Sequence, residues 1–329
     1  MKALILAGGL GTRLRPLTYT RPKPLLPIAG RPHIDHVLDL LHRHGITEVV
    51  LTTSYLADAF HETSAAAVAR GMDVEVMRET RPLGTAGAIK NAVELVADET
   101  FLAFNGDVLT DVDLNELIAS HRGSEAVASI LLAPVDDPSA YGIVPTDDSG
   151  RVTGFIEKPT PEEATTNMIN AGVYVLEPEV LDRIPAGIPA SIERETFPAL
   201  VETGRVYAFG TDGYWMDVGT PHAYLAANLD ALAGRIALEV SGTRRDDSLI
   251  GEGAEIHTTA QIHSSYIGAG SRIEEGAVLR SCVLFPNVVI GMGASLQRYI
   301  VGEGAHIPPK TDGADAIIED GMRGLREGD

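Results

Sequence analysis

The chain has 329 residues, of which 44% are hydrophobic and 22% are charged, so it has enough apolar material for a globular core. Its formal net charge of −20 argues against nucleic acid or an anionic membrane as a partner. The single cysteine, Cys282, excludes an intrachain disulfide, and we expect it to be a small buried residue in a cytoplasmic protein. We expect no signal peptide and no membrane span, because the apolar runs are too short for either.

The first part of the chain alternates predicted strands and helices. We expect strands at Lys2–Ala7, Glu48–Thr53, Asp73–Met77 and Phe101–Asn105, and helices at His33–His44, Asp58–Ala69, Thr85–Val96 and Asp113–Arg122. This order predicts an α/β fold with a Rossmann-like, mostly parallel sheet and helices on both faces. Ligands bind beyond the carboxyl ends of the strands in such sheets, where the loop Gly8–Arg13 and the turn Asn105–Asp107 lie.

A mixed region follows Ala126, and we expect it to cover the substrate. Its predicted strands are Arg151–Ile156, Ile169–Leu176 and Val206–Phe209. A helix from Pro221 to about Leu238 closes the catalytic domain, which we expect to span residues 1–240.

A repeat of 17 residues begins at Ile250 and recurs at Ile267, Leu284 and Val301. Within each repeat the apolar residues follow steps of six, six and five, and glycine follows the first of them at Gly251, Gly268 and Gly302. This spacing predicts a short left-handed parallel β-helix over residues 248–310, because each coil buries its apolar residues only against the next coil. We expect the tail, 311–329, to fray, although Ala316–Ile318 offers a cap for the last coil.

Basic residues gather at the N-terminus of this acidic chain. The first 34 residues contain six lysines and arginines and no acidic residue. The loop Gly8–Arg13 follows the first predicted strand, and its glycines let backbone N–H groups approach an anion closely. Lys23 lies between Pro22 and Pro24, whose fixed φ angles stiffen the backbone around the cation. The pattern is neither a Walker A loop nor a complete dinucleotide fingerprint, but it predicts a polyphosphate site.

Several motifs in order resemble the sugar-1-phosphate nucleotidylyltransferases, also called nucleotide-sugar pyrophosphorylases. The motifs are Gly8–Thr18, Pro22–Pro24, Pro82–Gly87, Asn105–Asp107, Tyr141–Gly142, Glu157–Pro159, Asn170–Gly172 and Trp215–Pro221. They cover residues 1 to about 235, and a β-helix after the catalytic domain is common in the family. The resemblance implies an enzyme that joins a nucleoside triphosphate to a sugar-1-phosphate and releases pyrophosphate, with Mg²⁺ as cofactor.

The resemblance also implies the residues of the site. Catalytic roles fall to Arg13, Lys23 and Lys158. Nucleotide contacts come from Leu6, Ala7, Gly8, Gly9, Gly11, Thr12, Arg13, Glu79, Pro82, Leu83, Gly84, Thr85 and Asp107. Sugar-phosphate contacts come from Gly142, Glu157, Lys158 and Asn170, and Mg²⁺ is held by Asp107 and Asp217.

Several of these patterns also have purely structural interpretations. Asn105–Asp107 forms a simple turn in many proteins, and Glu157 with Lys158 is a common surface pair. We expect Trp215 to be mostly core that positions Asp217. Solvated or helix-capping roles are favoured for Asp111 and Asp113, and a surface face of a helix, rather than a metal cluster, is favoured for His33, His36, His42 and His44.

The segment Glu79–Ala88 is expected to face the base, with Glu79 accepting the N1–H and N2–H donors of guanine. The chain resembles the GDP-mannose pyrophosphorylase branch in Pro82–Gly87, Ile169–Tyr174, Ser191–Pro198 and Tyr214–Gly219. The β-helix has about three and a half predicted coils, so the assembly mode of longer relatives does not carry over directly. We expect a homo-oligomer assembled partly through the β-helix.

Three alternatives stay open. The first keeps the chemistry with another base, such as dTTP, ATP or UTP, and with glucose-1-phosphate or another sugar or cyclitol phosphate. The second is a non-catalytic paralogue that senses nucleotide sugars. The third is an acyltransferase that uses a histidine of the β-helix (His257, His263 or His306), but this hypothesis leaves the first 235 residues unexplained.

Overall fold

The computed structural model describes residues 1–323. The chain forms two compact units, one from Met1–Gly9 with Val37–Trp215 and the other from Leu10–His36 with the residues from Met216 onward. The chain therefore passes from the first unit to the second inside the glycine-rich loop and returns within helix α1 (His33–Arg43).

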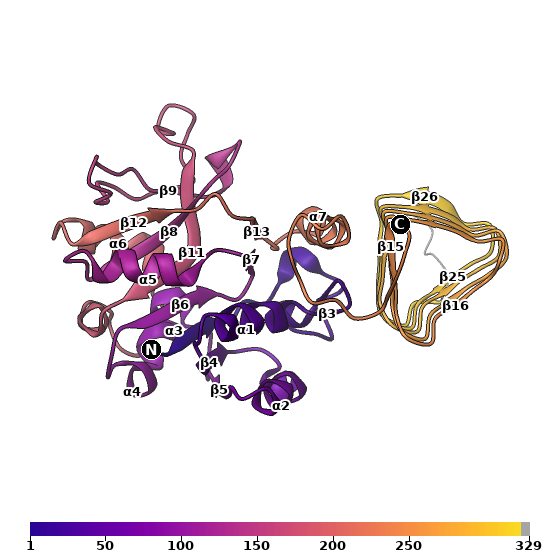
Figure 1. Cartoon of the computed structure of the whole chain (residues 1–329), viewed down its shortest axis with the longest axis horizontal. Coiled ribbons are helices and arrows are strands. Elements are labelled where there is room, and N and C mark those ends of the chain that lie inside the picture. The colour runs from indigo at the N-terminus through magenta and orange to yellow at the C-terminus, as the bar shows by residue number, and fades with distance from the viewer. Residues whose placement is uncertain (324–329) are drawn as a thin grey trace. The chain divides into compact units, whose positions relative to one another are not determined.

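A mixed nine-stranded sheet organises the first unit (Figure 1). Its strands are β1 (Ala3–Leu6), β4 (Glu48–Thr53), β5 (Asp73–Arg78), β6 (Phe101–Asn105), β8 (Ala128–Pro134), β9 (Gly142–Ile143), β10 (Ile156–Glu157), β11 (Met168–Leu176) and β12 (Val206–Gly210). Strands β6, β1, β4 and β5 are parallel neighbours, as the βαβ rhythm predicts. Strand β11 is antiparallel to both β6 and β8, so the sheet changes direction beside β6.

Helices pack against this sheet through apolar faces. They are α2 (His61–Ala69), α3 (Gly84–Asn91), α4 (Val93–Val96), α5 (Leu114–Arg122) and α6 (Phe197–Val201). Helix α3 contacts β1, α2 contacts β5, α5 contacts β8 and α6 contacts β12. The core is built from fully buried side chains of β6 and β11, including Phe101 and Tyr174, together with Phe197 of α6. Strands covered on both faces are continuous apolar runs rather than alternating ones, which explains the sequence of β1 and β6.

Several predicted elements differ from those observed. The predicted strand Arg151–Ile156 is wrong, because Arg151 and Val152 make only isolated bridges and the paired strands are β9 and β10. The predicted helix over Asp58–Ala69 begins as a 3-10 turn, and the one over Thr85–Val96 is divided at Ala92. Both helical segments lie where expected; the first differs only in its opening turn, where helix boundaries are weakly defined, whereas the second has an interior break at Ala92.

The N-terminal part of the second unit contains two 3-10 turns, η1 (Thr12–Leu14) and η2 (Lys23–Leu25), and the short strands β2 (Pro27–Ile28) and β3 (Arg31–Pro32). Helix α7 (Pro221–Leu232) contacts β2 and ends six residues before the predicted Leu238. The histidine prediction is wrong for two members. His33 and His36 are buried, and the ring Nε2 of His36 lies 2.9 Å from the carbonyl oxygen of Ile28.

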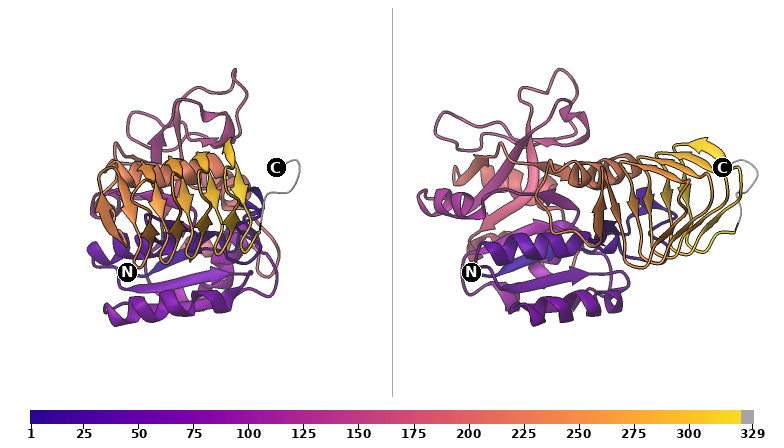
Figure 2. Two further views of the ribbon diagram at one scale, coloured as in Figure 1. Left: turned by 90° about the vertical axis from the view of Figure 1, so that its right-hand side faces the viewer. Right: turned by 45° about the vertical axis from the view of Figure 1, so that its right-hand side comes forward.

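The β-helix completes the second unit, as the 17-residue repeat predicts. Its strands are β14 (Thr243–Arg245), β15 (Ser248–Ile250), β16 (Glu255–Ile256), β17 (Gln261–His263), β18 (Tyr266–Ile267), β19 (Arg272–Ile273), β20 (Val278–Arg280), β21 (Val283–Leu284), β22 (Val289–Ile290), β23 (Ser295–Gln297), β24 (Ile300–Val301), β25 (His306–Ile307), β26 (Asp312–Ala314) and β27 (Ile317–Ile318). From β15 onward the strands stack in parallel, and Figure 2 shows the successive coils side by side.

The register of the stacked coils follows the repeat. Ile250 pairs with Ile267, Ile267 with Leu284, Leu284 with Val301 and Val301 with Ile318. The stack therefore continues beyond residue 310, and β27 forms part of the last coil. Residues 324–329 of the tail that was expected to fray lie outside the described residues. Cys282 is buried among the stacked apolar side chains, as expected.

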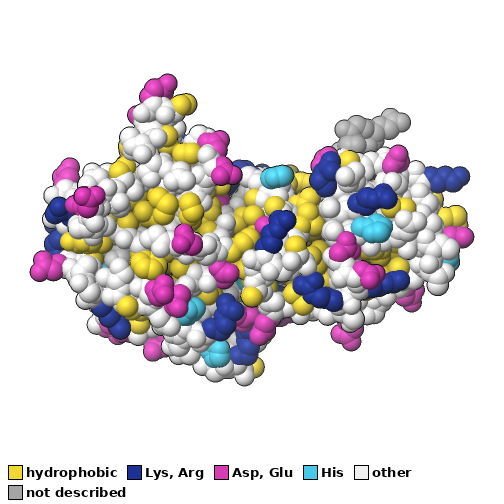
Figure 3. Space-filling view, turned by 45° about the horizontal axis from the view of Figure 1, so that its top comes forward, with side chains coloured by type: hydrophobic (Ala, Val, Ile, Leu, Met, Phe, Trp, Pro, Cys, Tyr) yellow, Lys and Arg dark blue, Asp and Glu magenta, His cyan; other side chains and the backbone are white. Residues whose placement is uncertain are grey.

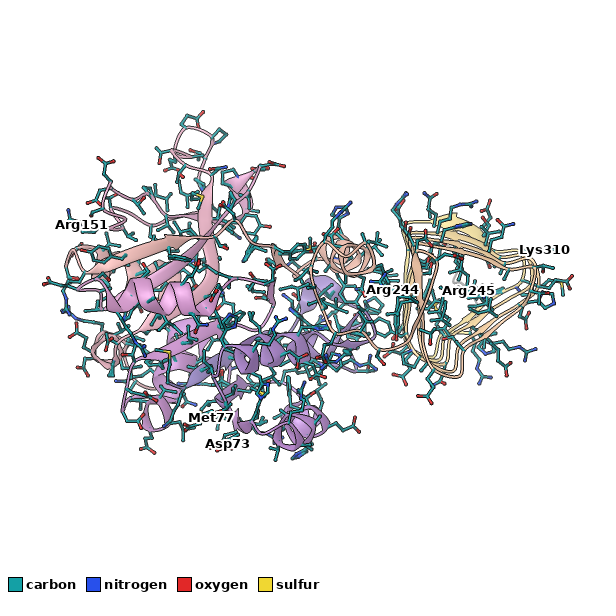
Figure 4. The ribbon with its side chains drawn as sticks, in the orientation of Figure 1. Asp73, Met77, Arg151, Arg244, Arg245 and Lys310 are labelled. Carbon is teal, nitrogen blue, oxygen red and sulfur yellow. The ribbon has the colours of Figure 1, made fainter. Side chains whose placement is uncertain are left out.

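The first coil of the β-helix is joined to α7. The guanidinium of Arg244 donates hydrogen bonds to the carbonyl oxygens of Ala231 and Leu232, at the C-terminus of α7 (Figure 4). A cation at this end of a helix satisfies otherwise free carbonyls. On the face shown in Figure 3, basic and acidic side chains are interspersed rather than separated into two patches. Among residues 1–323, no helix has both the length and the hydropathy that a membrane span requires.

Candidate functional site

The glycine-rich loop of the first unit lies beside a buried carboxylate. The hydroxyl of Ser54 donates to the carbonyl oxygen of Gly8 at 3.0 Å, and a Cβ added to Gly8 would lie 3.6 Å from Oε2 of Glu79. Glu79 follows β5 and is buried; Oε2 accepts the N–H of Leu83, while Oε1 has no hydrogen-bond partner among the described residues. Burial raises the pKa of the Glu79 carboxyl above its ordinary value, and the Leu83 N–H offsets part of this increase.

The turn that contains Asp107 is fixed against the end of β1. The N–H of Gly106 donates to the carbonyl oxygen of Leu6 at 3.0 Å, and a Cβ on Gly106 would lie 2.9 Å from that oxygen. Only glycine allows this close approach. The half-buried residue Asp107 therefore follows closely after the end of the pairing between β1 and β6, where Leu6 pairs with Asn105.

The predicted base-facing segment forms the start of α3. Gly84 has a positive φ of 70°, and a Cβ there would lie 2.5 Å from the carbonyl oxygen of Ala190, which accepts the N–H groups of Ala86 and Gly87. The hydroxyl of Thr85 donates to Glu193 at 2.7 Å. The N-terminus of α3 is thus held by the segment around Ala190, while Pro82 and Gly84 are exposed and Leu83 is buried.

The predicted sugar-phosphate residues Gly142 and Glu157 lie on the paired strands β9 and β10, and Lys158 follows directly after β10. Gly142 pairs with Glu157, and a Cβ on Gly142 would lie 2.9 Å from the Glu157 Oε2. Lys158 is exposed and has a φ of 52°, which is uncommon outside glycine, and its N–H donates to Tyr141 at 2.8 Å. Such backbone conformations gather at functional sites. Glu157 also lies 3.5 Å from the guanidinium of Arg194.

Asn170 takes part in a bulge of β11. Its Nδ2 donates to the hydroxyl of Tyr174 at 2.8 Å, and its Oδ1 accepts the N–H of Gly172 at 3.1 Å. The pairing of β11 with β8 shifts register between Asn170 and Tyr174. Asn170 therefore has a structural role in the strand. Trp215, expected to be mostly core, is only partly buried, and its indole N–H donates to the carbonyl oxygen of Ala171 at 2.8 Å.

The second unit brings Arg13, Lys23 and Asp217 together. Lys23 is buried, and its Nζ lies 3.7 Å from Oδ1 of Asp217. A Cβ on Gly219 would lie 2.6 Å from Nη2 of Arg13 and 2.7 Å from Oδ1 of Asp217. The space that a side chain at Gly219 would occupy is therefore filled by the guanidinium and the carboxylate. Gly11 has a positive φ of 60° and closes the loop that precedes η1, and Thr12 is exposed at the start of that turn.

Each unit carries its own set of charged groups among the predicted site residues. The first unit offers a carboxylate acceptor at Glu79, an exposed lysine at Lys158 and a carboxylate at Asp107. The second offers two cations beside the carboxylate of Asp217. Cations next to carboxylates suit a reaction in which phosphate charge is neutralised and a hard metal ion is bound. Among residues 1–323 no group of three or more His, Cys, Asp and Glu side chains is arranged to hold a metal ion.

The structure adds residues to which the sequence assigned no role. Gly219 matters because it leaves room for the side chains of Arg13 and Asp217. Arg194 matters because its guanidinium pairs with the carboxylate of Glu157. Both residues lie within motifs of the family resemblance, but only spatial contacts show what they do. Asp113 caps α5 by accepting the N–H of Asn115, as expected, and Asp111 accepts the N–H of Tyr214.

Comparison with known proteins gives the family. The model described as "Nucleotidyl transferase" matches residues 2–234, and the one described as "GlmU-like, C-terminal hexapeptide" matches residues 238–321. The chain belongs to the nucleotidyl transferase family. It is 40% identical to a mannose-1-phosphate guanylyltransferase of Mycobacterium tuberculosis over 90% of this chain and 83% of the relative. It is 38% identical to a mannose-1-phosphate guanyltransferase of Candida albicans over 97% of this chain and 91% of the relative.

Solved structures show the same catalytic fold. HddC of Yersinia pseudotuberculosis is similar with a TM-score of 0.61 and 32% identity, over 69% of this chain and 97% of that protein. A putative glucose-1-phosphate thymidylyltransferase of Bacillus anthracis is similar with a TM-score of 0.65 and 25% identity, over 73% of this chain and 97% of that protein. Together with the hexapeptide match, these likenesses confirm the predicted α/β domain followed by a left-handed β-helix.

Gly219→Ala tests the convergence of Arg13 and Asp217. The new methyl group displaces flexible side-chain ends rather than backbone, so we expect the fold to survive while nucleotidyl transfer falls about 100-fold. The control is Gly154→Ala, where an added Cβ has no neighbour closer than 4.0 Å. Steady-state pyrophosphate release measures nucleotidyl transfer by both variants, and a thermal melt shows whether each variant is folded. An active Gly219→Ala enzyme contradicts the assignment.

Proposed function

We propose that this chain transfers a guanylyl group from GTP to mannose-1-phosphate, forming GDP-mannose and pyrophosphate. A phosphate oxygen of the sugar phosphate attacks the α-phosphorus of GTP, the new P–O bond forms in line, and the bond to pyrophosphate breaks. No covalent enzyme intermediate is required, so the protein contributes positioning and charge neutralisation.

The buried carboxylate of Glu79 beside Gly8 is the observation that carries the choice of base. Guanine presents two adjacent donors, N1–H and N2–H, and an unpartnered carboxylate oxygen in a dry site is a strong acceptor for them. Uracil and thymine present one ring donor, and adenine has no N1–H. A buried carboxylate oxygen that has no partner among the described residues, as Oε1 of Glu79 has none, is costly, and a guanine base would remove this cost.

The cations are assigned to phosphate groups. In the proposal, Arg13 and Lys23 contact the triphosphate and the charge that develops on the leaving pyrophosphate, and Lys158 contacts the phosphate of mannose-1-phosphate. Loop N–H groups at Gly8, Gly9 and Gly11 approach the triphosphate as in other anion-binding turns. Glu157 and Asn170 face the hydroxyl groups of the sugar, for which Gly142 leaves room.

Mg²⁺ fits the donor set. Asp107 and Asp217 would hold it through their carboxylates, and Mg²⁺ commonly takes one or two carboxylates together with substrate phosphates rather than a full protein cage. When bound, Mg²⁺ neutralises phosphate charge. Lys23, beside Asp217, orients that carboxylate in the second unit.

The choice of sugar is supported by the relatives. Curated proteins that match most of this chain are mannose-1-phosphate guanylyltransferases, and one structure of HddC is a complex with GMP-PN. All residues to which the catalytic roles are assigned are present, which favours an enzyme over a sensor of nucleotide sugars. The proposal also includes a cytoplasmic location and a homo-oligomer assembled partly through the β-helix.

A grid of substrates tests the proposal directly. Pyrophosphate release is measured with Mg²⁺ for GTP, ATP, dTTP, UTP and CTP, each against mannose-1-phosphate and glucose-1-phosphate. We expect turnover to be fastest with GTP and mannose-1-phosphate. If another combination of nucleoside triphosphate and sugar phosphate is turned over fastest, the proposed specificity is wrong but the proposed reaction type stands. Silence across the grid with tight binding of GDP-mannose identifies a sensor instead.

Glu79→Gln tests guanine recognition. Because a charged acceptor is replaced by a neutral amide, we expect kcat/KM for GTP to fall about 10- to 100-fold. The loss is expected to be smaller for inosine triphosphate, which lacks the 2-amino group. Glu75→Gln is the control, because Glu75 is exposed on the same strand, β5. Equal losses for the two nucleotides would remove Glu79 from base recognition.

The raised pKa of Glu79 adds a pH dependence. Guanine needs the ionised carboxylate, so the KM for GTP of the wild type is expected to rise as the pH falls through this pKa, while Glu79→Gln shows no such change. The folded protein holds this proton to higher pH than the unfolded chain, so ionisation lowers stability as pH rises. The glutamine variant should therefore melt no lower than the wild type at neutral pH. A pH-independent KM in the wild type contradicts the assignment.

Asp107→Asn tests the metal site. The amide is a weaker Mg²⁺ ligand than the carboxylate, so we expect Mg²⁺-dependent turnover to fall by orders of magnitude while the melting temperature is retained. Asp113→Asn is the control, because asparagine caps a helix as well as aspartate does. Unchanged turnover in Asp107→Asn would remove Asp107 from the metal site.

A further inference from the structure

The segment between Arg13 and Lys23 folds back on itself. Here residues 15–22 are called the arm. The hydroxyl of Thr18 donates to the carbonyl oxygen of Gly11 at 2.8 Å. A Cβ on Gly11 would lie 2.9 Å from Cγ2 of Thr18 and 3.2 Å from Cβ of Lys23. Thr18, in the middle of the arm, and Lys23, directly after it, are therefore both packed against Gly11, so the arm and the backbone of Lys23 share one packing contact.

Three successive coils of the β-helix hold the far part of the arm. The guanidinium of Arg21 lies over the ring of Phe285, 5.3 Å from its centroid, and Nη2 of Arg21 donates to Oε2 of Glu303 at 2.5 Å. The hydroxyl of Thr20 donates to Oδ2 of Asp320 at 2.6 Å. Glu303 and Asp320 are 17 residues apart, so they occupy the same position on neighbouring coils.

These anchoring side chains are themselves fixed. Oδ1 of Asp320 accepts the N–H of Glu303 at 2.7 Å, and a Cβ on Gly302 would lie 2.5 Å from that oxygen. Phe285 is fully buried and meets the ring of Tyr224 edge-on, with centroids 6.4 Å apart. A planar guanidinium that both stacks and hydrogen-bonds is held more firmly than a single surface ion pair.

A single residue, Pro22, connects the anchored Arg21 to Lys23. Pro22 separates Arg21 from Lys23 and is buried, and its ring fixes φ at the junction. The N–H of Leu25 donates to the carbonyl oxygen of Pro22 at 2.9 Å, which starts the turn η2. A fixed Arg21 therefore restricts the backbone of Lys23, whose Nζ lies 3.7 Å from Asp217.

We propose that Arg21, held by Glu303 and Phe285 while its neighbour Thr20 is held by Asp320, is a positioning residue for Lys23, so that the β-helix directly supports the catalytic cation. This inference rests on the role that the proposed function gives to Lys23. Small displacements of a positioned group have large effects on rate, so the partly buried contact between Arg21 and Glu303 contributes more to turnover than an ordinary surface ion pair does.

The test compares two ion pairs whose carboxylates both lie on the β-helix. Glu303→Gln breaks the pair with Arg21, whereas Asp315→Asn breaks the exposed pair of Arg298 and Asp315, which has the same N–O distance of 2.5 Å but joins two neighbouring coils. We expect Glu303→Gln to lower kcat about tenfold or more with little change in the KM for GTP or the melting temperature, and Asp315→Asn to leave both kinetic constants unchanged. Arg21→Glu combined with Glu303→Arg is expected to restore part of the lost kcat.

Amide hydrogen exchange at Lys23, Leu25 and Leu26 gives a readout that does not depend on substrate, since Pro22 and Pro24 carry no amide hydrogen. Faster exchange in Glu303→Gln, together with lower kcat, supports the proposal. Faster exchange with wild-type kcat overturns the positioning role, and unchanged exchange overturns the hold on the arm. A wild-type protein that is silent with every substrate pair overturns the proposed function, and exchange alone then decides whether the β-helix holds the arm.

Discussion

Buried hydrogen bonds from helix α7 tie the N-terminal segment of the second unit to the C-terminal part of the chain. The amide of Asn228 is fully buried; its Oδ1 accepts the N–H of Ala29 at 3.0 Å and its Nδ2 donates to Tyr224 at 2.9 Å. The hydroxyl of Tyr224 donates to Pro27. An unpaired polar group here would be costly, so these partners specify one arrangement. The placement of Lys23 beside Asp217, and of the arm against the β-helix, depends on it.

Close packing at glycines, rather than added side chains, shapes the catalytic residues. Gly106 lets the Asp107 turn meet the end of β1, Gly142 leaves room beside Glu157, and Gly219 leaves room for Arg13 and Asp217. Each of these glycines lies in a family motif. These glycines contribute no functional group of their own. They act by leaving space, because the missing side chain allows charged groups or backbone atoms to approach each other closely. Motif matching finds such positions, but contacts explain them.

Charge is distributed in a way that serves an anionic substrate. The chain is acidic overall, yet its first 34 residues carry only cations. In the structure two of these, Arg13 and Lys23, face the carboxylate of Asp217, while Arg21 pairs with Glu303. Cations balanced by neighbouring carboxylates stay oriented without a ligand, and they can neutralise phosphate when one binds. The same N-terminal cluster thus contains both phosphate-directed and structural members.

The sequence by itself determined the features that depend on local periodicity. The 17-residue repeat fixed the register of every coil, and the apolar runs and turns placed β1, β4 and β6, because side-chain period and turn chemistry act over a few residues. The motifs gave the family and the candidate residues. Tertiary structure alone decided the pairing of β9 with β10, the burial of His33 and His36, the bulge at Asn170 and the contact of Arg21 with Glu303. These features depend on contacts between residues far apart in the chain, and no local pattern records which distant partner will satisfy a buried polar group or a charge.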